Sequence, residues 1–361
     1  MKVMQVLYSG LGGHGSVVTS LIDADASKEW EHCLLFYGTE DLLPAYRSFC
    51  ETKKIPFSFV QKSKGAFNTG WRQVAKAFAS HSPDVIILHS PNLVFPAWLY
   101  CRRKKAALFT VEHTPHEAKG LGEKAASFFS LIMSKKVVCL SQEYRSRLHA
   151  QFRILPVLKK TEVIPNGIDL DGFRPSVKPA SQEISIGMIG RFSHQKNQAM
   201  IVEAIRTGLK GTTVYVHFAG TGDTLAGLTE LVVQHKLEKQ VHFHGLLDGD
   251  GIRSFLTTLD IYIHASYAET MCTSVMQAMA CGLPVLASDI PGINNIVEAG
   301  KNALLFKNDD IAEMLEKLRQ LQDAALRKEM GEQARQFAVT HFSARQTFQQ
   351  YSQMIINHTK R

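Results

Sequence analysis

The 361-residue chain is predicted to be an α/β protein of two doubly wound domains, in which parallel strands alternate with helices. Two observations lead to this prediction. Short, almost continuously apolar runs alternate with longer segments of helical period, and the alternation pauses once near the middle of the chain. The length agrees with two domains, because domains average about 150 residues.

The first half should contain five buried strands, since an almost continuous apolar run suits a parallel strand that is covered on both faces. These runs are residues 3–8, 33–37, 84–89, 107–112 and 136–140. Helical periodicity between the runs predicts helices, for example over residues 66–81 and 120–134.

The alternation pauses over residues 164–182, where two prolines follow Asn166-Gly167 and large apolar residues become rare towards the end. This composition predicts a linker that ends the first domain near residue 178. Six further strand-like runs then follow: residues 184–190, 214–220, 241–245, 260–266, 284–288 and 303–306.

We therefore place an N-terminal domain at residues 1–178 and a C-terminal domain at residues 179–342. The remaining segment, 343–361, has apolar residues at helical spacing, which predicts a helix packed on another part of the protein. These residues are Phe348, Tyr351, Met354 and Ile355.

The composition excludes several protein classes. Hydrophobic residues make up 45% and charged residues 20%, which excludes a disordered chain, a collagen-like repeat and a polytopic membrane protein. The six cysteines are scattered without a C-x-x-C pair, so we expect free thiols in a reducing compartment rather than disulfides or a zinc site. We expect neither a signal peptide nor a spanning helix, because the apolar runs are too short.

The positive charge is concentrated in the first half. Residues 1–180 contain 24 basic and 15 acidic residues, against 17 and 18 in residues 181–361. Basic clusters at 102–105 and 135–136 follow the apolar segments 95–100 and 128–133. We interpret this half as facing an anionic bilayer, although helices with basic C-terminal turns would give the same pattern. Nucleic acid is not an expected partner, since basic and aromatic residues do not interleave.

Three motifs follow predicted strands, where ligands bind in open parallel sheets. The first is a glycine-rich turn, Gly10 to Gly15, that fits G-x-G-x-x-G and precedes a helical pattern. Backbone N–H groups there could approach a phosphate or a sugar oxygen. An NAD site or a tight turn without a ligand are the alternatives. Glu40 lies too far beyond the second strand for a good NAD match.

The second motif, residues 190–197, carries Arg191 and Lys196, and two cations at a strand end suit a diphosphate. The alternative is a solvated loop with ordinary surface charges.

The third motif begins at Glu269, which could reach a sugar hydroxyl and which could equally be an ordinary acidic residue before a helix. We expect the next residues to open a helix whose free N–H groups bind an anion. These residues are Met271, Cys272, Thr273 and Ser274. Gln277, further along that helix, is a second candidate for a hydroxyl contact.

Together these features resemble glycosyltransferase family 4, the retaining enzymes of the GT-B type. The resemblance rests on the glycine-rich turn and on VEHTP (111–115), IPNGID (164–169), GRFSHQKN (190–197) and the block from Glu269 to Gly292. It implies two Rossmann-like domains facing across a cleft, with a C-terminal helix that crosses back to the first domain.

The resemblance also implies roles for single residues. Arg191 and Lys196 would hold the donor diphosphate. Glu269 would be the first glutamate of the family's E-x7-E motif and a catalytic residue together with His113. Gln277 stands where the family has a second glutamate that holds the ribose, which puts the nucleotide preference in doubt. Gly13 would lie near the donor, and His244 near the base.

The function implied is transfer of a sugar from a nucleotide-sugar, a UDP-hexose or UDP-N-acetylhexosamine, to a lipid-diphosphate-linked oligosaccharide or a polysaccharide. The setting would be bacterial surface-glycan synthesis (O-antigen, lipopolysaccharide or capsule), in the cytoplasm at the inner face of the membrane. An NAD-dependent oxidoreductase and a non-catalytic sugar-nucleotide-binding protein are the alternatives.

Neither a cofactor nor a metal ion is expected, because Arg191 and Lys196 could neutralise the diphosphate. Three Asp-x-Asp strings, at 23–25, 169–171 and 248–250, could instead indicate a metal-dependent transferase. None of them ends a predicted strand, so we interpret them as solvated loop acids.

Overall fold

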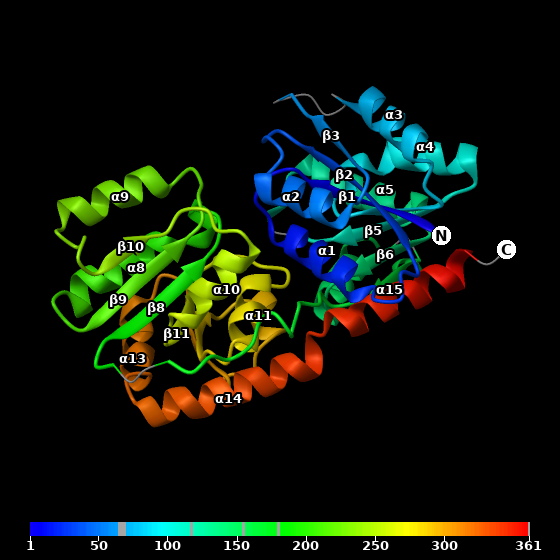
Figure 1. Ribbon diagram of the computed structural model, residues 1–361. Helices are drawn as coiled ribbons and strands as arrows, with labels where there is room; N and C mark the ends of the chain where they lie inside the picture. The colour runs from blue at the N-terminus through cyan, green and yellow to red at the C-terminus, as the bar shows by residue number, and fades with distance from the viewer. Residues whose placement is uncertain (64–69, 116–117, 154–155, 179–180, 360–361) are drawn as a thin grey trace. The chain divides into compact units, whose positions relative to one another are not determined.

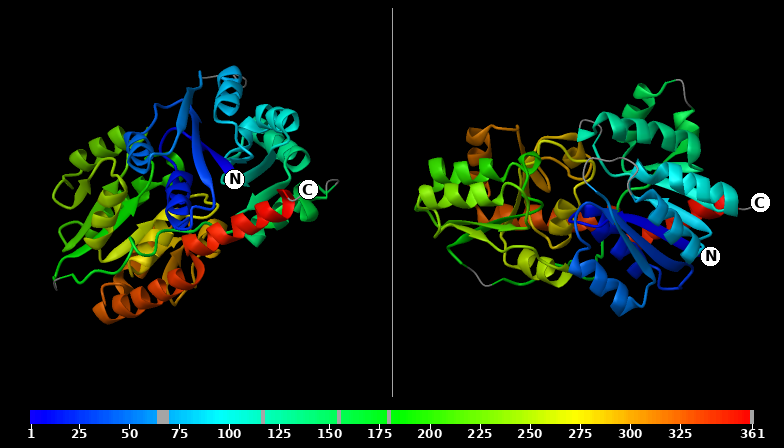
Figure 2. Two further views of the ribbon diagram at one scale, coloured as in Figure 1. Left: turned by 45° about the vertical axis from the view of Figure 1, so that its right-hand side comes forward. Right: turned by 90° about the horizontal axis from the view of Figure 1, so that it is seen from above.

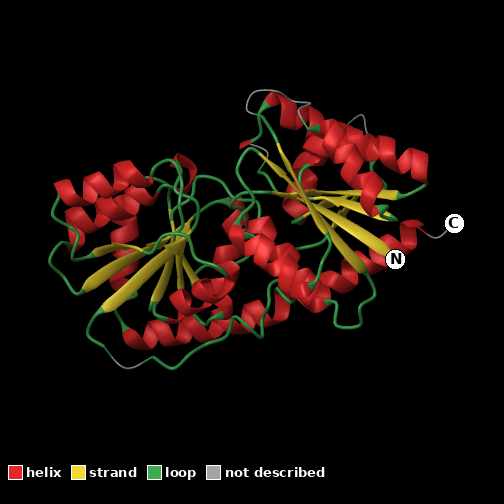
Figure 3. Ribbon diagram, turned by 45° about the horizontal axis from the view of Figure 1, so that its top comes forward, coloured by secondary structure: helices red, strands yellow, loops and turns green. Residues whose placement is uncertain are grey.

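The protein divides into two compact units (Figure 1). Met1–Gly167 and Ala344–Arg361 form the first unit, and Ile168–Ser343 forms the second. The structure, a computed structural model, describes residues 1–63, 70–115, 118–153, 156–178 and 181–359. Each unit contains one parallel sheet with helices on both faces (Figure 3), which confirms the predicted class of two doubly wound domains.

The first sheet has seven strands, and each pairs in parallel with its neighbours. In sheet order they are β3 (Phe57–Gln61), β2 (Glu31–Gly38), β1 (Lys2–Tyr8), β4 (Val85–Leu88), β5 (Ala107–Glu112), β6 (Lys136–Cys139) and β7 (Thr161–Val163). All five predicted strands are present. The two strands that were not predicted, β3 and β7, lie at the edges of the sheet, where partial exposure removes the continuous apolar pattern.

Helices cover both faces of this sheet. They are α1 (Gly13–Ala24), α2 (Pro44–Lys53), α3 (Trp71–His81), η1 (Pro91–Leu93), α4 (Val94–Lys104), α5 (Leu121–Met133), α6 (Gln142–Gln151), α7 (Val157–Lys160) and α15 (Ala344–Thr359). α3 and α4 share a core with Met4 and Ile86, whereas α1 and α2 pack with Leu7 and Leu34 on the opposite face. The predicted helix at 120–134 is α5. The predicted helix at 66–81 is described from Trp71, because residues 64–69 lie outside the described ranges.

The C-terminal helix α15 belongs to the first unit, as predicted, and runs beside α1 (Figures 1 and 2). Phe348 lies with its ring centroid 4.6 Å from that of Trp30. Phe348, Tyr351 and Met354 are buried, as their helical spacing predicted. The Thr347 hydroxyl donates to the carbonyl of Pro165 (3.2 Å), which fixes the start of the helix.

The second sheet has six parallel strands, all of them predicted. In sheet order they are β10 (Val241–Phe243), β9 (Val214–Ala219), β8 (Ile184–Ile189), β11 (Ile261–His264), β12 (Val285–Ser288) and β13 (Ala303–Phe306). The four interior strands are almost wholly buried and apolar, as a parallel strand that is covered on both faces should be.

The helical segments of the second unit are η3 (His194–Lys196), α8 (Gln198–Ala204), the π-helical η4 (Ile205–Leu209), α9 (Leu225–Gln234), α10 (Gly249–Thr257), α11 (Thr273–Ala280), α12 (Pro291–Asn294), α13 (Ile311–Gln320) and α14 (Ala324–His341). Residues of α8, α9 and α13 form one core, and residues of α10, α11 and α14 form a second core on the other face. Across the described residues of both units, no helix has the length and apolar character needed to cross a membrane.

The boundary between the units follows Gly167, whereas the sequence placed it between residues 178 and 179. Residue 179 itself lies outside the described ranges. Ile168 and Phe173 are buried in the core of the second unit, and the Arg335 guanidinium donates to the carbonyl of Phe173 (2.8 Å). The prolines and sparse apolar residues of this segment therefore mark a chain that packs on the second unit.

Candidate active site

Two loops of the second unit meet at the carboxyl edge of its sheet. One follows β8 and the other follows β11, and these two strands are neighbours. The Tyr267 N–H donates to the carbonyl of Gln195 (2.9 Å), and the Gln195 amide donates to the carbonyl of Ala268 (2.7 Å). Gly292 is required beside them, since a Cβ there would lie 2.1 Å from the Glu269 carbonyl oxygen. The loops are therefore held in one arrangement.

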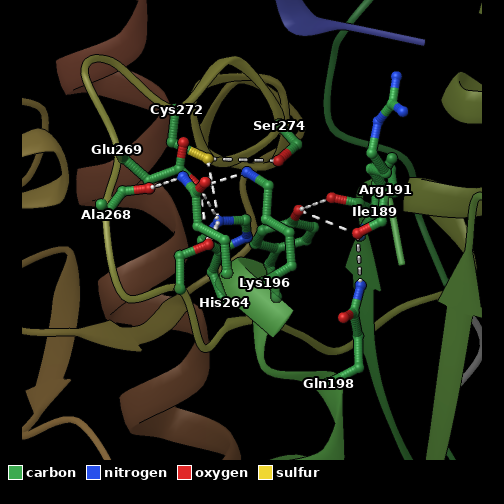
Figure 4. A network of polar contacts seen from close by, with 12 residues as sticks. Ile189, Arg191, Lys196, Gln198, His264, Ala268, Glu269, Cys272 and Ser274 are labelled. Carbon is green, nitrogen blue, oxygen red and sulfur yellow. Dashed lines mark hydrogen bonds and ion pairs between the residues drawn. The ribbon is translucent and has the colours of Figure 1, made fainter. Parts of the chain in front are cut away.

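A carboxylate is the centre of the polar network between these loops (Figure 4). The Lys196 ammonium donates to Oε1 of Glu269. The same oxygen accepts from the Ser266 hydroxyl (2.7 Å) and lies 2.8 Å from Nε2 of His264. The side chains of Lys196 and Glu269 remain 20% and 12% exposed, whereas His264 is fully buried. A ligand could therefore reach the ion pair, whereas the histidine contacts Glu269 from the buried side.

The network continues to the start of α11. Cys272, the residue before this helix, has its Sγ 3.3 Å from Nε2 of His264 and 3.4 Å from the Ser274 hydroxyl. Cys272 is buried. The first turn of α11 thus adjoins the carboxylate network, and its N–H groups add partial positive charge there.

The charges of the network stabilise one another. Burial alone would raise the pKa of Glu269, but Lys196 and His264 hold it well below its ordinary value. Burial alone would lower the pKa of His264, but Cys272 and Glu269 raise it to about 9. The pKa of Lys196 is also raised, because the Glu269 carboxylate outweighs burial. At neutral pH, the Glu269 carboxylate therefore stays ionised beside the Lys196 ammonium, and both partners hold His264 in its charged form.

The first unit has a cluster of histidines at the carboxyl edge of its own sheet. His113 directly follows β5, and its Nε2 lies 2.9 Å from Nδ1 of His89. The His14 ring, in the first turn of α1, has its centroid 5.6 Å from that of His113, and its Nε2 accepts from the Tyr8 N–H (3.1 Å). Burial lowers the pKa of His14 to about 4, so its imidazole is neutral at pH 7.

Comparison with known families accounts for almost the whole chain. The model described as glycosyltransferase family 4 matches residues 11–171, and the model described as glycosyl transferases group 1 matches residues 171–337. The chain belongs to glycosyltransferase family 4.

Curated relatives of this family 4 protein are distant. A component of the phosphatidylinositol N-acetylglucosaminyltransferase of Arabidopsis thaliana is 27% identical over 192 residues, which are 52% of this chain and 42% of that protein. The UDP-Gal:alpha-D-GlcNAc-diphosphoundecaprenol alpha-1,3-galactosyltransferase of Escherichia coli is 26% identical over 251 residues, 65% of this chain and 63% of that protein. The chain thus spans less than two thirds of the length of these relatives.

Solved structures show the same fold. HepE of Anabaena, in complex with UDP and glucose, has a TM-score of 0.82 at 19% identity, covering 99% of this chain and 100% of that one. The sucrose-phosphate synthase of Thermosynechococcus elongatus has a TM-score of 0.81 at 17% identity, covering 99% and 98%. The two units therefore have the GT-B fold of glycosyltransferases.

Within this family 4 fold, the structure brings together some of the residues predicted for the donor site. Lys196, Glu269, Cys272 and Ser274 form one network. The side chain of Arg191 extends away from that network in Figure 4, and its role at the diphosphate stays a prediction.

The other predicted residues of the second unit lie around this network. Met271 precedes α11, which begins at Thr273, so the helix starts later than the sequence predicted. Gln277 is buried within α11. His244 follows the edge strand β10, where its Nε2 lies 3.1 Å from Nδ1 of His217. The roles assigned to these residues, and to Gly13 at the start of α1, stay predictions.

Three residues could together hold a metal ion, since His264, Glu269 and Cys272 have ligand atoms within 4.8 Å of one another. In the structure, the Lys196 ammonium already pairs with Oε1 of Glu269, so a cation of the chain itself lies beside these ligand atoms.

The three Asp-x-Asp strings have local structural roles. Asp25 accepts from the backbone N–H of Trp30 (3.0 Å). Asp169 accepts from the N–H of Gly172 (2.9 Å). Asp248 accepts from the N–H of Gly251 (2.8 Å) at the start of α10. The interpretation of all three strings as solvated loop acids is wrong in part, because Asp23 lies in α1, Asp250 lies in α10 and Asp25 is buried. That the strings do not bind a metal ion stays a prediction.

Sequence reasoning missed His264 and Ser266, which contact Glu269 directly. Both lie at the end of the predicted strand at 260–266, and polar residues at the carboxyl end of a parallel strand are a signal that could have identified them. It also missed His89, which ends the predicted strand at 84–89 and contacts His113.

Proposed function

We propose that this protein is a retaining, metal-independent glycosyltransferase. It would move a hexose or N-acetylhexosamine from a UDP-sugar to a lipid-diphosphate-linked oligosaccharide or a polysaccharide in bacterial surface-glycan synthesis. The observation that carries the proposal is the Lys196–Glu269 pair at the carboxyl edge of the second sheet, supported by His264. The names of relatives agree with it: one uses UDP-Gal and a diphosphoundecaprenol-linked sugar, and HepE binds UDP-glucose.

In this proposal, the bond between C1 of the sugar and the diphosphate oxygen breaks while the acceptor oxygen bonds to C1 on the same face. The acceptor proton goes to the leaving phosphate. Lys196 and the N–H groups at the start of α11 stabilise the negative charge that develops on that phosphate. Glu269, fixed through Oε1, orients the sugar by accepting from its hydroxyl groups.

The acceptor side of the proposal rests on α4 and α5 of the first unit. These adjacent helices carry exposed apolar side chains: Phe95, Leu99, Leu121, Phe129 and Ile132. The last turn of α4 is basic, with Arg102, Arg103 and Lys104. We call this the basic-apolar surface. Exposed apolar groups next to basic groups suit an anionic bilayer, at about 1 kcal/mol for each basic residue near the membrane. We therefore propose peripheral association with the inner face of the cytoplasmic membrane.

A thermal-shift panel of UDP-, GDP- and ADP-sugars tests the donor. A sugar nucleotide at about 100 times its Kd should stabilise the protein by about 2.7 kcal/mol. Nucleotide release with a polyprenyl-diphosphate-linked acceptor should follow for the sugar that binds. Stabilisation by NADH instead would favour an oxidoreductase. Donor binding without release with any acceptor would favour a non-catalytic binding protein.

Vesicle sedimentation tests the membrane. The protein should bind vesicles with anionic lipid at low salt, and binding should weaken at high salt. Replacing Phe95 and Phe129 by Ser should reduce binding. Val233→Ser, which changes a similarly exposed apolar residue of the second unit, is the matched control. No binding at low salt would contradict this part of the proposal.

A further inference from the structure

The two central strands of the second sheet, β8 and β11, lie where the strand order reverses, since β9 and β10 follow on one side and β12 and β13 on the other. In an open parallel sheet, ligands bind at this point. The backbone register of the two strands ends with Gly187 opposite Tyr262, whereas β8 runs on to Ile189. The end of β8 is therefore held to β11 by something other than this backbone pairing.

The side chain of Tyr262 supplies that connection. The Ile189 N–H donates to the Tyr262 hydroxyl (3.2 Å), and this hydroxyl donates to the Ile189 carbonyl (3.3 Å). Tyr262 is fully buried, and burial raises the pKa of its phenol, so the hydroxyl keeps its proton at neutral pH. One side-chain oxygen thus contacts both polar groups of the Ile189 backbone.

The same hydroxyl also contacts the start of α11. Ser274, the second residue of that helix, hydrogen-bonds to Tyr262 through its side chain, and its hydroxyl lies 3.4 Å from Sγ of Cys272. A phenol has one proton to donate and accepts through its lone pairs. Its proton is directed to the Ile189 carbonyl, so it accepts from the Ile189 N–H and from Ser274. Tyr262 therefore joins the end of β8 to the first turn of α11.

Both of these elements belong to the donor site of the proposed function, on which this inference rests. The loop after Ile189 carries Lys196, and the first turn of α11 has N–H groups without partners inside the helix. We propose that Tyr262 is a positioning residue that fixes the start of α11 to the end of β8, so that these N–H groups and Lys196 face one diphosphate. Tyr262 is buried and acts through Ile189 and Ser274 rather than by contact with the substrate.

Amide hydrogen exchange, measured without any nucleotide, tests the contact with β8. Tyr262→Phe should speed exchange of the Ile189 N–H about tenfold or more, because this variant removes the oxygen to which the N–H donates. Tyr215→Phe, which removes the hydroxyl of a half-buried tyrosine of β9, is the matched control and should leave this exchange rate unchanged. An unchanged rate in Tyr262→Phe would overturn the proposal.

Calorimetric titration with UDP tests the positioning role. Tyr262→Phe should raise the Kd for UDP about tenfold, which corresponds to one misaligned hydrogen bond to the diphosphate, while the number of UDP molecules bound per chain stays the same. A loss of folded protein would instead lower the number of binding sites and leave the Kd unchanged. An unchanged Kd in Tyr262→Phe would therefore contradict a positioning role.

A double-mutant cycle with Ser274→Ala tests whether the phenol acts through α11. Ser274→Ala should also raise the Kd for UDP, and the double variant should raise it no further than the larger of the two single effects, because both changes break the same connection. Effects that multiply would show that Tyr262 and Ser274 act separately, against the proposal.

The two kinds of measurement separate this inference from the proposed function. If UDP does not bind the unchanged protein, the proposed donor is wrong, and the exchange rate of the Ile189 N–H then decides by itself whether Tyr262 fixes the end of β8. If UDP binds with the same Kd to the unchanged protein and to Tyr262→Phe, the proposed donor stands and the role of Tyr262 is wrong.

Discussion

Lys196 and Glu269, which are 73 residues apart in the chain, form an ion pair in which Nζ donates to Oε1. His264 and Ser266 contact the same oxygen. Three groups on one oxygen fix the orientation of the carboxylate and keep it ionised. In the proposed reaction, a diphosphate at Lys196 would share an ammonium that already pairs with Glu269, so the binding of the sugar and of the phosphate would be coupled through this pair.

Removing either member of the pair should strongly reduce sugar transfer. Lys196→Ala and Glu269→Ala should each lower kcat about a hundredfold or more, because each removes a preorganised charge from the reacting centre. The measurement is nucleotide release at saturating donor. Lys239→Ala, at an exposed lysine of the same unit, is the control and should keep the normal rate. A near-normal rate in either site variant would contradict the assignment.

In the double variant Lys196→Ala, Glu269→Ala, the fold decrease in kcat should be much smaller than the product of the fold decreases in the two single variants. The single variants each leave one charge of a partly buried pair without its partner, so their effects are not independent. A double-mutant cycle measured with the same assay would show this coupling. Multiplicative losses would show that the two residues act separately.

Removal of divalent metal should leave transfer unchanged, because the Lys196 ammonium already pairs with the Glu269 carboxylate and could neutralise the diphosphate without a metal ion. The measurement is the rate after dialysis against EDTA, with and without added Mn²⁺. Loss of activity that Mn²⁺ restores would show that the diphosphate is neutralised by an ion rather than by Lys196.

Acid should destabilise the first unit, since burial lowers the pKa of His89 to about 3 and that of His14 to about 4. Between these values and the unfolded value of about 6.5, the unfolded state binds more protons, so the free energy of unfolding rises with pH. Between pH 7 and pH 5, the shifted pKa of His89 alone should lower the free energy of unfolding by about 2 kcal/mol.

Urea titration followed by tryptophan fluorescence measures this effect, because all three tryptophans of the chain, Trp30, Trp71 and Trp98, lie in the first unit. The pH dependence should be smaller in His89→Asn, which has no titrating group at that position. An equal free energy of unfolding at pH 7 and pH 5 would contradict the prediction. It would show that the rings take up protons in the folded protein as readily as in the unfolded protein.

A second ion pair should support the stability of the first unit. Lys119 and Glu112 are fully or almost fully buried, and the Lys119 ammonium also donates to the hydroxyl groups of Ser127 and Tyr144, both at 2.8 Å. Lys119→Met should lower the free energy of unfolding by about 3–5 kcal/mol, because it leaves the Glu112 carboxylate buried without its cation.

The double variant Glu112→Gln, Lys119→Met should recover much of that loss, since it removes both charges. Lys104→Met, at an exposed lysine, is the control, and urea titration with tryptophan fluorescence is again the measurement. A double variant as unstable as Lys119→Met would show that the loss comes from packing rather than from an unpaired charge.

The strands were predictable wherever both faces are covered, because burial leaves an almost continuous apolar run in the sequence. This is why the four interior strands of the second sheet were expected and why the edge strands β3 and β7 were not. The edge strands β10 and β13 were found because their sequences still carry short apolar runs. The boundary was placed too late for a related reason. Prolines and sparse apolar residues report local chain stiffness and polarity, but they do not report that Ile168 and Phe173 pack on the second unit.

The sequence by itself determined the two doubly wound sheets, the family and the loops at the carboxyl ends of the strands, because these depend on local patterns and motifs. Only the tertiary structure decided which side chains meet. It paired Lys196 with Glu269, added His264 and Ser266 to that carboxylate and connected His113 to His89 and Gln5. The physical reason is that strand order and register bring together residues that are far apart in the chain, and no local pattern records those contacts.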